Sequence, residues 1–313
     1  MIGSYFINQA RQHISERGIY SGIKETSYDI YKHLWMFSEP LFPDGELIWE
    51  RKFDLLIILD ACRLDMFETV LPEYDYLPDS TDSIRSIAGN SELWMERTFS
   101  EVEYENLGEV TYISGNPNTM DSVDNSELGM VDEVYEYGWN EKYGTVLPDI
   151  ITDRAITTQR KTDPEKLILH YMQPHHPFVR SSAITRSSAA GHKKNPDRER
   201  TAHPWKRLRR GELEYDLVWQ AYMDNLRYIL DHLPKLLNNI DADRAIITAD
   251  HGNLVGEYGL YAHPSRCPVN ALRRVPWCTV ESKDTGEYTP KKTKRDSVDK
   301  EVNEKLRSLG YKA

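Results

Sequence analysis

Cysteine is scarce in this chain of 313 residues, which has only Cys62, Cys267 and Cys278. Three cysteines cannot form the disulfide framework that holds small secreted domains together. Long apolar runs are also missing. The longest aliphatic run, residues 55–59, has five residues, whereas a helix that crosses a bilayer needs about 20. We therefore expect no transmembrane segment.

The sequence also lacks a secretory signal and an excess of positive charge. Residues 1–15 carry Asn, Gln and Arg where a signal peptide would have an apolar core, so we expect a cytoplasmic protein, or one peripheral to a membrane. The 39 Lys and Arg are outnumbered by 50 Asp and Glu, which gives a net charge of −11. This acidic balance argues against nucleic acid as a partner.

The charges are unevenly distributed along the chain. Residues 101–141 hold eleven acids and no Lys or Arg, whereas residues 180–212 hold ten Lys or Arg and three acids. The basic stretch is also rich in Ser, Ala, Gly and Pro, which is typical of a long surface loop. Two interpretations stay open: a solvated insertion, or a cationic lid over an anionic substrate.

Apolar runs alternate with helical patterns along the chain. The predicted strands are residues 53–59, 110–113, 167–172, 245–248 and 276–280. The predicted helices are residues 64–70, 148–160 and 212–237. Pro234 is expected to kink or end the last helix. Strands that alternate with helices predict an α/β fold with a mainly parallel central sheet. Residues 1–50, helical in part, are expected to pack on this domain as an extension, and a surface role on a partner or membrane is the alternative.

Residues suited to metal binding follow three of the predicted strands. Asp60 follows the first strand, and Asp250 and His251 follow the fourth. His175 and His176 follow the third. In open α/β sheets, ligands bind beyond the carboxyl ends of the strands. Two carboxylates and three imidazoles, without a cysteine cluster, suit a divalent ion such as Mn, Zn or Mg.

Several segments resemble the sulfatase-like branch of the alkaline phosphatase superfamily, and they occur in the order of that family. They are residues 59–65 (LDACRLD), 169–178 (LHYMQPHHPF), 248–259 (TADHGNLVGEYG), 274–277 (RVPW) and 306–311 (LRSLGY). The resemblance implies a three-layer sandwich of the alkaline phosphatase type. It also implies a catalytic domain over residues 51–313, with a basic loop insertion at about 180–212 and an N-terminal helical extension over residues 1–50.

The resemblance implies a metal centre with a nucleophile beside it. Asp60, Asp250 and His251 are the implied ligands of one or two divalent ions, with Mn, Zn, Mg or Ca as the candidates. Ser91, within Gly-Asn-Ser-Glu-Leu-Trp at residues 89–94, is the implied nucleophile and a further metal ligand. The start of a helix would place its oxygen beside free N–H groups, which stabilise an anionic oxygen.

Several site assignments keep an alternative. Ser91 also fits a plain N-cap role. Other candidates for the nucleophile are Ser86, Ser83 and Thr81. His175 or His176 resembles the histidine that contacts the transferred anion or its leaving group, the alternative being a hydrogen-bonded loop pair.

Two further residues are candidates for substrate binding. His263, in Tyr-Ala-His-Pro at residues 261–264, could bind the substrate or a second metal ion, and the alternative is a histidine of a surface loop without a role in the site. Arg63 suits contact with the anion or a structural salt bridge.

One departure from the family limits the chemistry. Sulfatases proper convert a Cys or Ser in the context Cys/Ser-x-Pro-x-Arg to formylglycine, and residues 80–95 contain no such pentapeptide. The sequence therefore predicts a metal-dependent hydrolase or transferase that acts through a serine on phosphate, phosphonate or sulfate esters. The expected substrate is an anionic small molecule, a lipid head group or a glycan ester. The alternatives are a sulfuric ester hydrolase without formylglycine and a non-catalytic binding protein in glycan modification.

Overall fold

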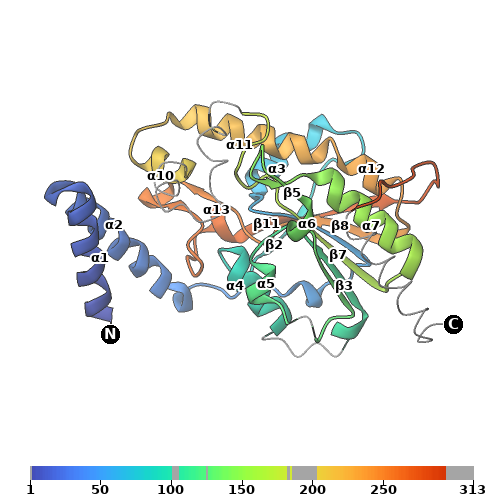
Figure 1. Ribbon diagram of the computed structural model, residues 1–313, viewed down its shortest axis with the longest axis horizontal. Coiled ribbons are helices and arrows are strands. Elements are labelled where there is room, and N and C mark those ends of the chain that lie inside the picture. Colours follow the sequence, from blue (N-terminus) through green and yellow to red (C-terminus); the bar gives the residue numbers. More distant parts are fainter. Residues whose placement is uncertain (1, 101–105, 125, 182–183, 185–202, 294–313) are drawn as a thin grey trace.

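A mixed sheet of seven strands forms the centre of the molecule (Figure 1). This computed structural model describes residues 2–100, 106–124, 126–181, 184 and 203–293. The strands lie in the order β2, β11, β8, β1, β7, β3 and β4. All pairs from β8 to β4 are parallel, and β11 is antiparallel to both of its neighbours. The predicted α/β fold with a mainly parallel sheet is confirmed.

The sheet strands are β1 (Leu55–Leu59), β2 (Asp82–Arg85), β3 (Val110–Ser114), β4 (Met130–Glu133), β7 (Lys166–Tyr171), β8 (Ala242–Thr248) and β11 (Arg274–Ser282). Two small ladders pair β5 (Trp139–Asn140) with β6 (Thr145–Val146), and β9 (Leu254–Val255) with β10 (Tyr261–Ala262). The helices are α1 (Ile2–Arg17), α2 (Ile19–Phe37), α3 (Leu64–Val70), α4 (Ser91–Met95), α5 (Thr119–Ser122), α6 (Tyr135–Gly138), α7 (Pro148–Thr162), α10 (Pro204–Arg209), α11 (Tyr215–Leu230), α12 (Leu233–Leu237) and α13 (Asn270–Arg273).

Helices cover both sides of the sheet. α3, α11 and α12 lie above the sheet in the view of Figure 1, and α4 and α5 lie below it. The five residues of β1 are all aliphatic and all buried, because the strand is covered on both faces. A strand that is buried on both faces needs apolar side chains throughout, and this continuous apolar run is the signal from which the strand is predicted.

Two strands of the central sheet and the longest predicted helix differ from the sequence prediction, which also omits several short elements. β2 and β4 have four residues each, lie at the two edges of the sheet and contain few apolar side chains, so their sequences give little strand signal. The long helix predicted over residues 212–237 is two helices, α11 and α12, separated by Asp231 and His232. Pro234 begins the second helix, where its fixed φ is tolerated.

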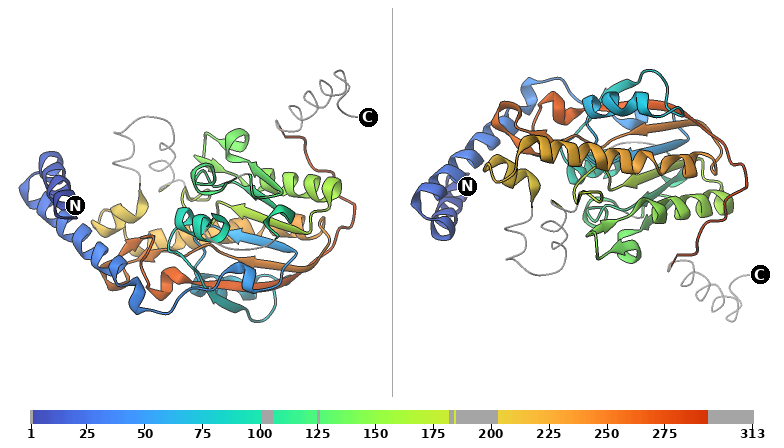
Figure 2. Two further views of the ribbon diagram at one scale, coloured as in Figure 1. Left: turned by 90° about the horizontal axis from the view of Figure 1, so that it is seen from below. Right: turned by 90° about the horizontal axis from the view of Figure 1, so that it is seen from above.

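Helices α1 and α2 form a hairpin that extends from one end of the molecule (Figures 1 and 2). Gly18 joins the two helices with a φ of 80°, a conformation that favours glycine. Gly22 is buried where α2 crosses α1, and a Cβ there would lie 2.6 Å from the backbone nitrogen of Ile14. In the described part of the chain, every helix is too short or too polar to span a bilayer.

The basic stretch from residue 180 to residue 212 is described only in part. Residues 182–183 and 185–202 lie outside the described residues, and so does the segment 306–311. The last part of the stretch forms α10, in which Arg209 is ion-paired with Glu25 of α2. The proposed lid therefore stays a prediction.

A buried ion pair ties α7 to the edge strand β4. Arg154 Nη2 lies 2.6 Å from Asp132 Oδ2, and both side chains are buried. We expect Arg154→Leu to lower the free energy of unfolding by about 3–5 kcal/mol, because it leaves the Asp132 charge buried without its cation. Arg180→Leu is the control, since Arg180 and Asp231 form an exposed pair that contributes about 0–1 kcal/mol. Denaturant unfolding measures both values, and equal losses would contradict the prediction.

Candidate active site at the carboxyl edge of the sheet

Three side chains suited to metal binding meet where β1 and β8 lie side by side. Asp60 directly follows β1, and Asp250 and His251 follow the end of β8. One ligating atom from each residue lies within 4.8 Å of the other two, and all three side chains are buried. The structure therefore brings together the residues that the sequence indicates as metal ligands.

The atoms that face one another in this cluster are all acceptors. His251 Nε2 lies 3.7 Å from Asp60 Oδ1 and 3.4 Å from Asp250 Oδ2, and both oxygens are buried without a hydrogen-bond partner. The His251 proton is assigned to Nδ1, which donates to the carbonyl oxygen of Gly252 at 2.7 Å. Its Nε2 lone pair therefore points at the carboxylates. Buried acceptors in this arrangement need a proton or a cation between them, and the donor set fits a divalent metal ion.

Burial and neighbouring charges set the protonation of these groups. Burial, with Asp250 beside it, raises the pKa of Asp60 well above its usual value. Burial acts on Asp250 in the same direction, but His251 and His170 outweigh it and lower the pKa of Asp250. Burial also lowers the pKa of His251, although the Asp250 charge opposes this shift. A bound cation would hold both carboxyls in the ionised form.

The remaining carboxylate oxygens are held by donors from the protein. The backbone N–H groups of Ala61 and His251 donate to Asp250 Oδ1 at 3.0 and 2.9 Å. Asn116 Nδ2 donates to Asp60 Oδ2 at 2.9 Å. Each carboxylate thus has one oxygen fixed by the protein and one oxygen directed into the cluster, which orients both groups before any ion binds.

Asn116 and His170 are absent from the site residues that the sequence indicates. Asn116 lies two residues beyond β3, so the rule that selected Asp60 could also have selected it. His170 lies within β7, and its Nε2 is 3.5 Å from Asp250 Oδ2. A histidine inside a buried strand usually has a structural role, and only its contact with Asp250, which follows β8, distinguishes it.

Ser91 is the first residue of α4, and its buried Oγ lies 3.2 Å from His251 Nε2. The other candidate hydroxyls have different surroundings. Ser86 is buried, and its Oγ donates to the backbone carbonyl oxygen of Asp250 or of Ala88. Ser83 and Thr81 lie in or next to β2 at the edge of the sheet. Of these four hydroxyls, that of Ser91 is beside the ligating atoms.

The cap of α4 is a different residue. The side chain of Asn90 accepts a hydrogen bond from the backbone N–H of Leu93 at 3.3 Å, so Asn90 is the N-cap. The structure therefore favours a functional role for Ser91 over the plain capping role.

Residues 264–273 form a segment that supports two parts of the site at once. The backbone N–H of Gly89 donates to the carbonyl oxygen of Ser265 at 2.6 Å, two residues before Ser91. The backbone N–H of Gly252, which directly follows His251, donates to the carbonyl oxygen of Leu272 at 2.7 Å. A Cβ at Gly89 or Gly252 would lie 2.4 or 2.3 Å from a carbonyl oxygen of this segment. Glycine is therefore required at both close approaches.

A row of histidines extends away from the cluster of Asp60, Asp250 and His251, the candidate metal-ligand cluster. The ring of His263 lies 5.0 Å from that of His251, and its Nε2 is 3.3 Å from His175 Nε2. His175 stacks on His176 with 4.4 Å between ring centroids. His176 Nε2 lies 3.4 Å from His203 Nε2. The three predicted histidines are thus brought together near the metal ligands, while their roles stay predictions.

His203 is the residue of this row that the sequence does not indicate. It precedes α10 and is 27 residues away from His176 in the sequence, so no local motif points to it. Burial, with His175 and Lys206 nearby, lowers the pKa of His203 to about 3. This imidazole is therefore neutral at pH 7.

Arg63 has its guanidinium group fully engaged. Its Nη2 lies 2.6 Å from Asp65 Oδ2, and its Nη1 lies 2.6 Å from Glu257 Oε1. Nη1 also donates to the carbonyl oxygen of Asn253 at 2.9 Å. The structure therefore favours the structural salt bridge over the substrate contact expected from the sequence.

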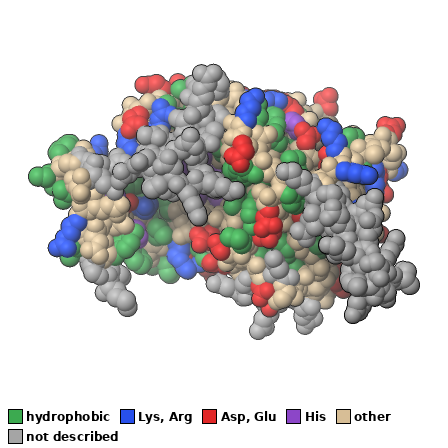
Figure 3. Space-filling view, in the orientation of Figure 1, with side chains coloured by type: hydrophobic (Ala, Val, Ile, Leu, Met, Phe, Trp, Pro, Cys, Tyr) green, Lys and Arg blue, Asp and Glu red, His purple; other side chains and the backbone are tan. Residues whose placement is uncertain are grey.

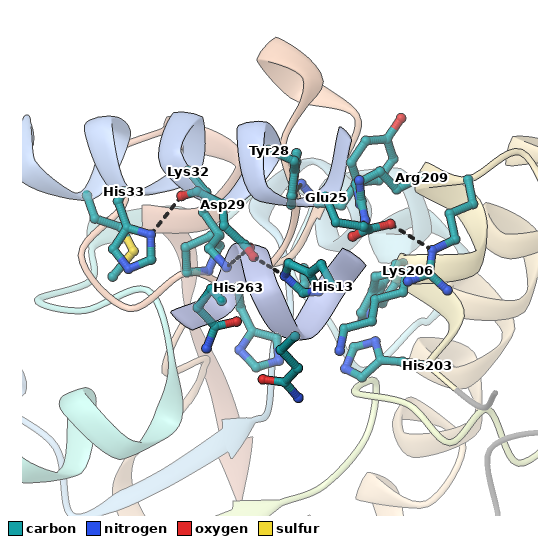
Figure 4. A pocket seen from close by; sticks show the side chains of 18 of the residues that line it. His13, Glu25, Tyr28, Asp29, Lys32, His33, His203, Lys206, Arg209 and His263 are labelled. Carbon is teal, nitrogen blue, oxygen red and sulfur yellow. Dashed lines mark hydrogen bonds and ion pairs between the residues drawn. The ribbon is translucent and has the colours of Figure 1, made fainter. Parts of the chain in front are cut away.

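A cavity of about 840 Å³ adjoins the histidine row (Figure 4). One wall of the cavity is lined by His203, Lys206 and His263 of the sheet domain. The opposite wall is lined by residues of the helical hairpin that include Tyr28 and Lys32. The cavity therefore connects the neighbourhood of the metal-ligand cluster with the N-terminal hairpin.

Solved structures with some similarity to this chain include phosphoethanolamine transferases. The integral membrane lipooligosaccharide phosphoethanolamine transferase A of Neisseria meningitidis is 16% identical, with a TM-score of 0.44, over 92% of this chain and 59% of that chain. The C-terminal periplasmic domain of phosphoethanolamine transferase EptC of Campylobacter jejuni is 14% identical, with a TM-score of 0.46, over 72% of this chain and 77% of that chain. No curated protein matches the sequence.

The comparisons correct one prediction from the sequence. The matching structures are those of an integral membrane protein and of a periplasmic domain. The prediction of a cytoplasmic location is therefore wrong. The absence of an apolar core in residues 1–15 tests for one kind of signal alone and does not determine the location.

The family model for sulfatases matches residues 85–295, which is more than half of the chain. The matched region contains Ser91, the histidines of the row, and Asp250 with His251, while Asp60 precedes it. This match confirms the resemblance seen in the sequence motifs. The chain therefore belongs to the sulfatase family of the alkaline phosphatase superfamily and is an enzyme that acts on phospho- or sulfo-esters.

Proposed function

We propose that this protein is a metal-dependent transferase or hydrolase of phosphate or phosphonate esters, with Ser91 as the nucleophile. The observation that carries the proposal is the 3.2 Å between Ser91 Oγ and His251 Nε2, in the same cluster as the two unpartnered carboxylate oxygens. We propose Asp60, Asp250 and His251 as the metal ligands, with Ser91 as a further ligand. A bound divalent ion would favour the ionised serine and polarise the ester oxygens.

The residues around the cluster suit an in-line displacement. Ser91 Oγ, after its proton has passed to solvent, forms a bond to phosphorus while the bond to the leaving oxygen breaks, and that oxygen takes up a proton. Water or an acceptor hydroxyl then loses its proton and forms a bond to phosphorus, while the bond to Ser91 Oγ breaks and Ser91 is protonated again. The short contact between His263 Nε2 and His175 Nε2 requires an N–H on one of the two rings, and this group is placed to donate to the ester or its leaving oxygen.

The chemistry near Ser91 favours phosphorus over sulfur. Residues 80–95 lack the pentapeptide that is converted to formylglycine, and all three cysteines are buried elsewhere. A serine activated beside a metal suits phosphoryl transfer. The proposed substrate class is a phosphate ester of an anionic small molecule, a lipid head group or a glycan. The second candidate is a sulfuric ester hydrolase without formylglycine, which the match to the sulfatase family favours.

Removal of the nucleophile tests the proposal directly. We expect Ser91→Ala to lower kcat by about 10³-fold or more on aryl phosphate esters, because no covalent step remains. Metal content and thermal stability should stay near those of the parent protein. Ser83→Ala is the matched control and should keep full activity, because Ser83 lies on the edge strand β2. Wild-type turnover by Ser91→Ala would eliminate Ser91 as the nucleophile.

A panel of esters separates the candidate functions. Aryl phosphate monoesters and diesters, phosphonates and sulfates are compared with the wild-type protein and with Ser91→Ala. Turnover of the phosphorus esters that depends on Ser91 supports the proposal. Turnover of sulfates alone favours the second candidate, and absence of turnover in a metal-loaded protein favours the non-catalytic alternative.

Metal binding is tested by analysis of the metal content of the purified protein. We expect Asp60→Asn and Asp250→Asn each to lose the bound metal, because each removes a charged ligand from a cluster of three. Asp153→Asn is the matched control: this buried carboxylate accepts a hydrogen bond from Tyr288 and lies on α7, away from the cluster.

Removal of the metal should also destabilise the protein. At an ion concentration of about 100 times Kd, a bound metal adds about 2.7 kcal/mol of stability. A chelator should therefore lower Tm and abolish turnover, and the metal should restore both. A metal content that is unchanged in both ligand variants would contradict the proposed site.

A further inference from the structure

The exposed apolar side chains of the molecule are concentrated on the N-terminal hairpin. Of the 16 large hydrophobic side chains that are exposed in the described part of the chain, 12 lie between residues 5 and 42. Tyr20 is 85% exposed, and Leu34 and Phe37 are each 62% exposed. Figure 3 shows hydrophobic side chains at the end of the molecule where the hairpin lies. A concentration of exposed apolar side chains on one element indicates an interaction surface.

The two faces of α2 have the reverse of the usual orientation. The residues of α2 that line the cavity are mostly polar, and they include Glu25, Asp29 and Lys32. Ile23, Ile30, Leu34 and Phe37 are spaced by seven, four and three residues, so they share one face, and all four are exposed. In a helix of a soluble domain the apolar face normally packs on the core. Here the mostly polar face packs toward the protein, with Trp35 beside it on the apolar cluster around Leu254 and Leu260. The face that carries Ile23, Ile30, Leu34 and Phe37 is turned outward.

The hairpin is attached to the catalytic domain through that polar face. Arg209 and Arg210 of the α10 region both bind Glu25 of α2. The hydroxyl of Tyr28 accepts a hydrogen bond from the backbone N–H of Tyr261 at 3.1 Å. These contacts hold the hairpin in place, so the outward direction of the apolar face is built into the fold.

The charges on the hairpin favour a negatively charged partner surface. Among the hairpin side chains that the structure describes, the exposed charged residues are Arg11 and Lys24, and both are positive. The acids Glu25 and Asp29 are partly buried and ion-paired on the cavity face. An apolar stripe on a hairpin whose exposed charges are positive, with exposed tyrosines on the same hairpin, matches the boundary between anionic head groups and acyl chains.

We propose that helices α1 and α2 bind to an anionic lipid surface through the apolar face of α2. From Ile23 to Phe37 this face is about 20 Å long, at a rise of about 1.5 Å per residue. The helix would lie in the plane of the interface and would not cross the bilayer. The proposal concerns binding alone, so it stands apart from the proposed reaction.

Sedimentation with vesicles tests the proposal in the full-length protein without substrate. The vesicles contain phosphatidylcholine alone or equal parts of phosphatidylglycerol and phosphatidylcholine. We expect the wild-type protein to sediment with the mixed vesicles, and added salt to weaken this binding. The double variant Leu34→Glu with Phe37→Glu should bind roughly tenfold or more weakly, because two apolar anchors are lost and two like charges are added.

The matched control carries the same chemical change on the catalytic domain. Met120 and Leu217 are also exposed, and the double variant Met120→Glu with Leu217→Glu should bind as the wild type does. Circular dichroism and Tm check that both double variants are folded. Equal binding by Leu34→Glu with Phe37→Glu and by the wild type would overturn the proposal. A second outcome would also overturn it: the wild-type protein does not bind vesicles but forms a dimer in analytical ultracentrifugation, and the variant Leu34→Glu with Phe37→Glu does not form this dimer.

Discussion

The electrostatic conflict between Asp60, Asp250 and His251 is the interaction on which the active site depends. Two carboxylate oxygens and one imidazole lone pair face each other in a buried space. The nearby protein donors are the Ser91 hydroxyl, 3.2 Å from His251 Nε2, and His170 Nε2, 3.5 Å from Asp250 Oδ2. Leaving such charges uncompensated in a protein interior costs several kcal/mol. This cost arises at the ends of the buried strands β1 and β8, because these two strands are adjacent and parallel and so bring the residues together.

Part of this arrangement could be predicted from the sequence because the sheet is parallel and covered on both sides. β1 leaves a continuous apolar run, and a polar residue at its end then stands out, as Asp60 does. Edge strands leave no such run, and β2 and β4 are absent from the prediction for that reason. The metal-ligand cluster was predictable for the same physical reason as the strands.

The supporting residues were not predictable in the same way, because their roles depend on strand order. Asn116 reaches Asp60 only because β3 and β1 are separated by the single strand β7. His203 meets His176 across a long stretch of intervening sequence. Arg63 follows Asp60 closely, but its partners Asp65 and Glu257 determine its role, and one of them comes from a distant loop. Pairings between distant segments leave no periodic signal in a single sequence.

The segment 264–273 has a consequence for how this enzyme can change during evolution. It contacts the backbone just before Ser91 and just after His251, and it directly follows His263, so one stretch of backbone sets the position of all three. These contacts are made by its backbone, so a side-chain replacement on its solvent side leaves that alignment intact. An inserted or deleted residue would displace three elements of the site together. The composition of this segment is therefore expected to vary more freely than its length.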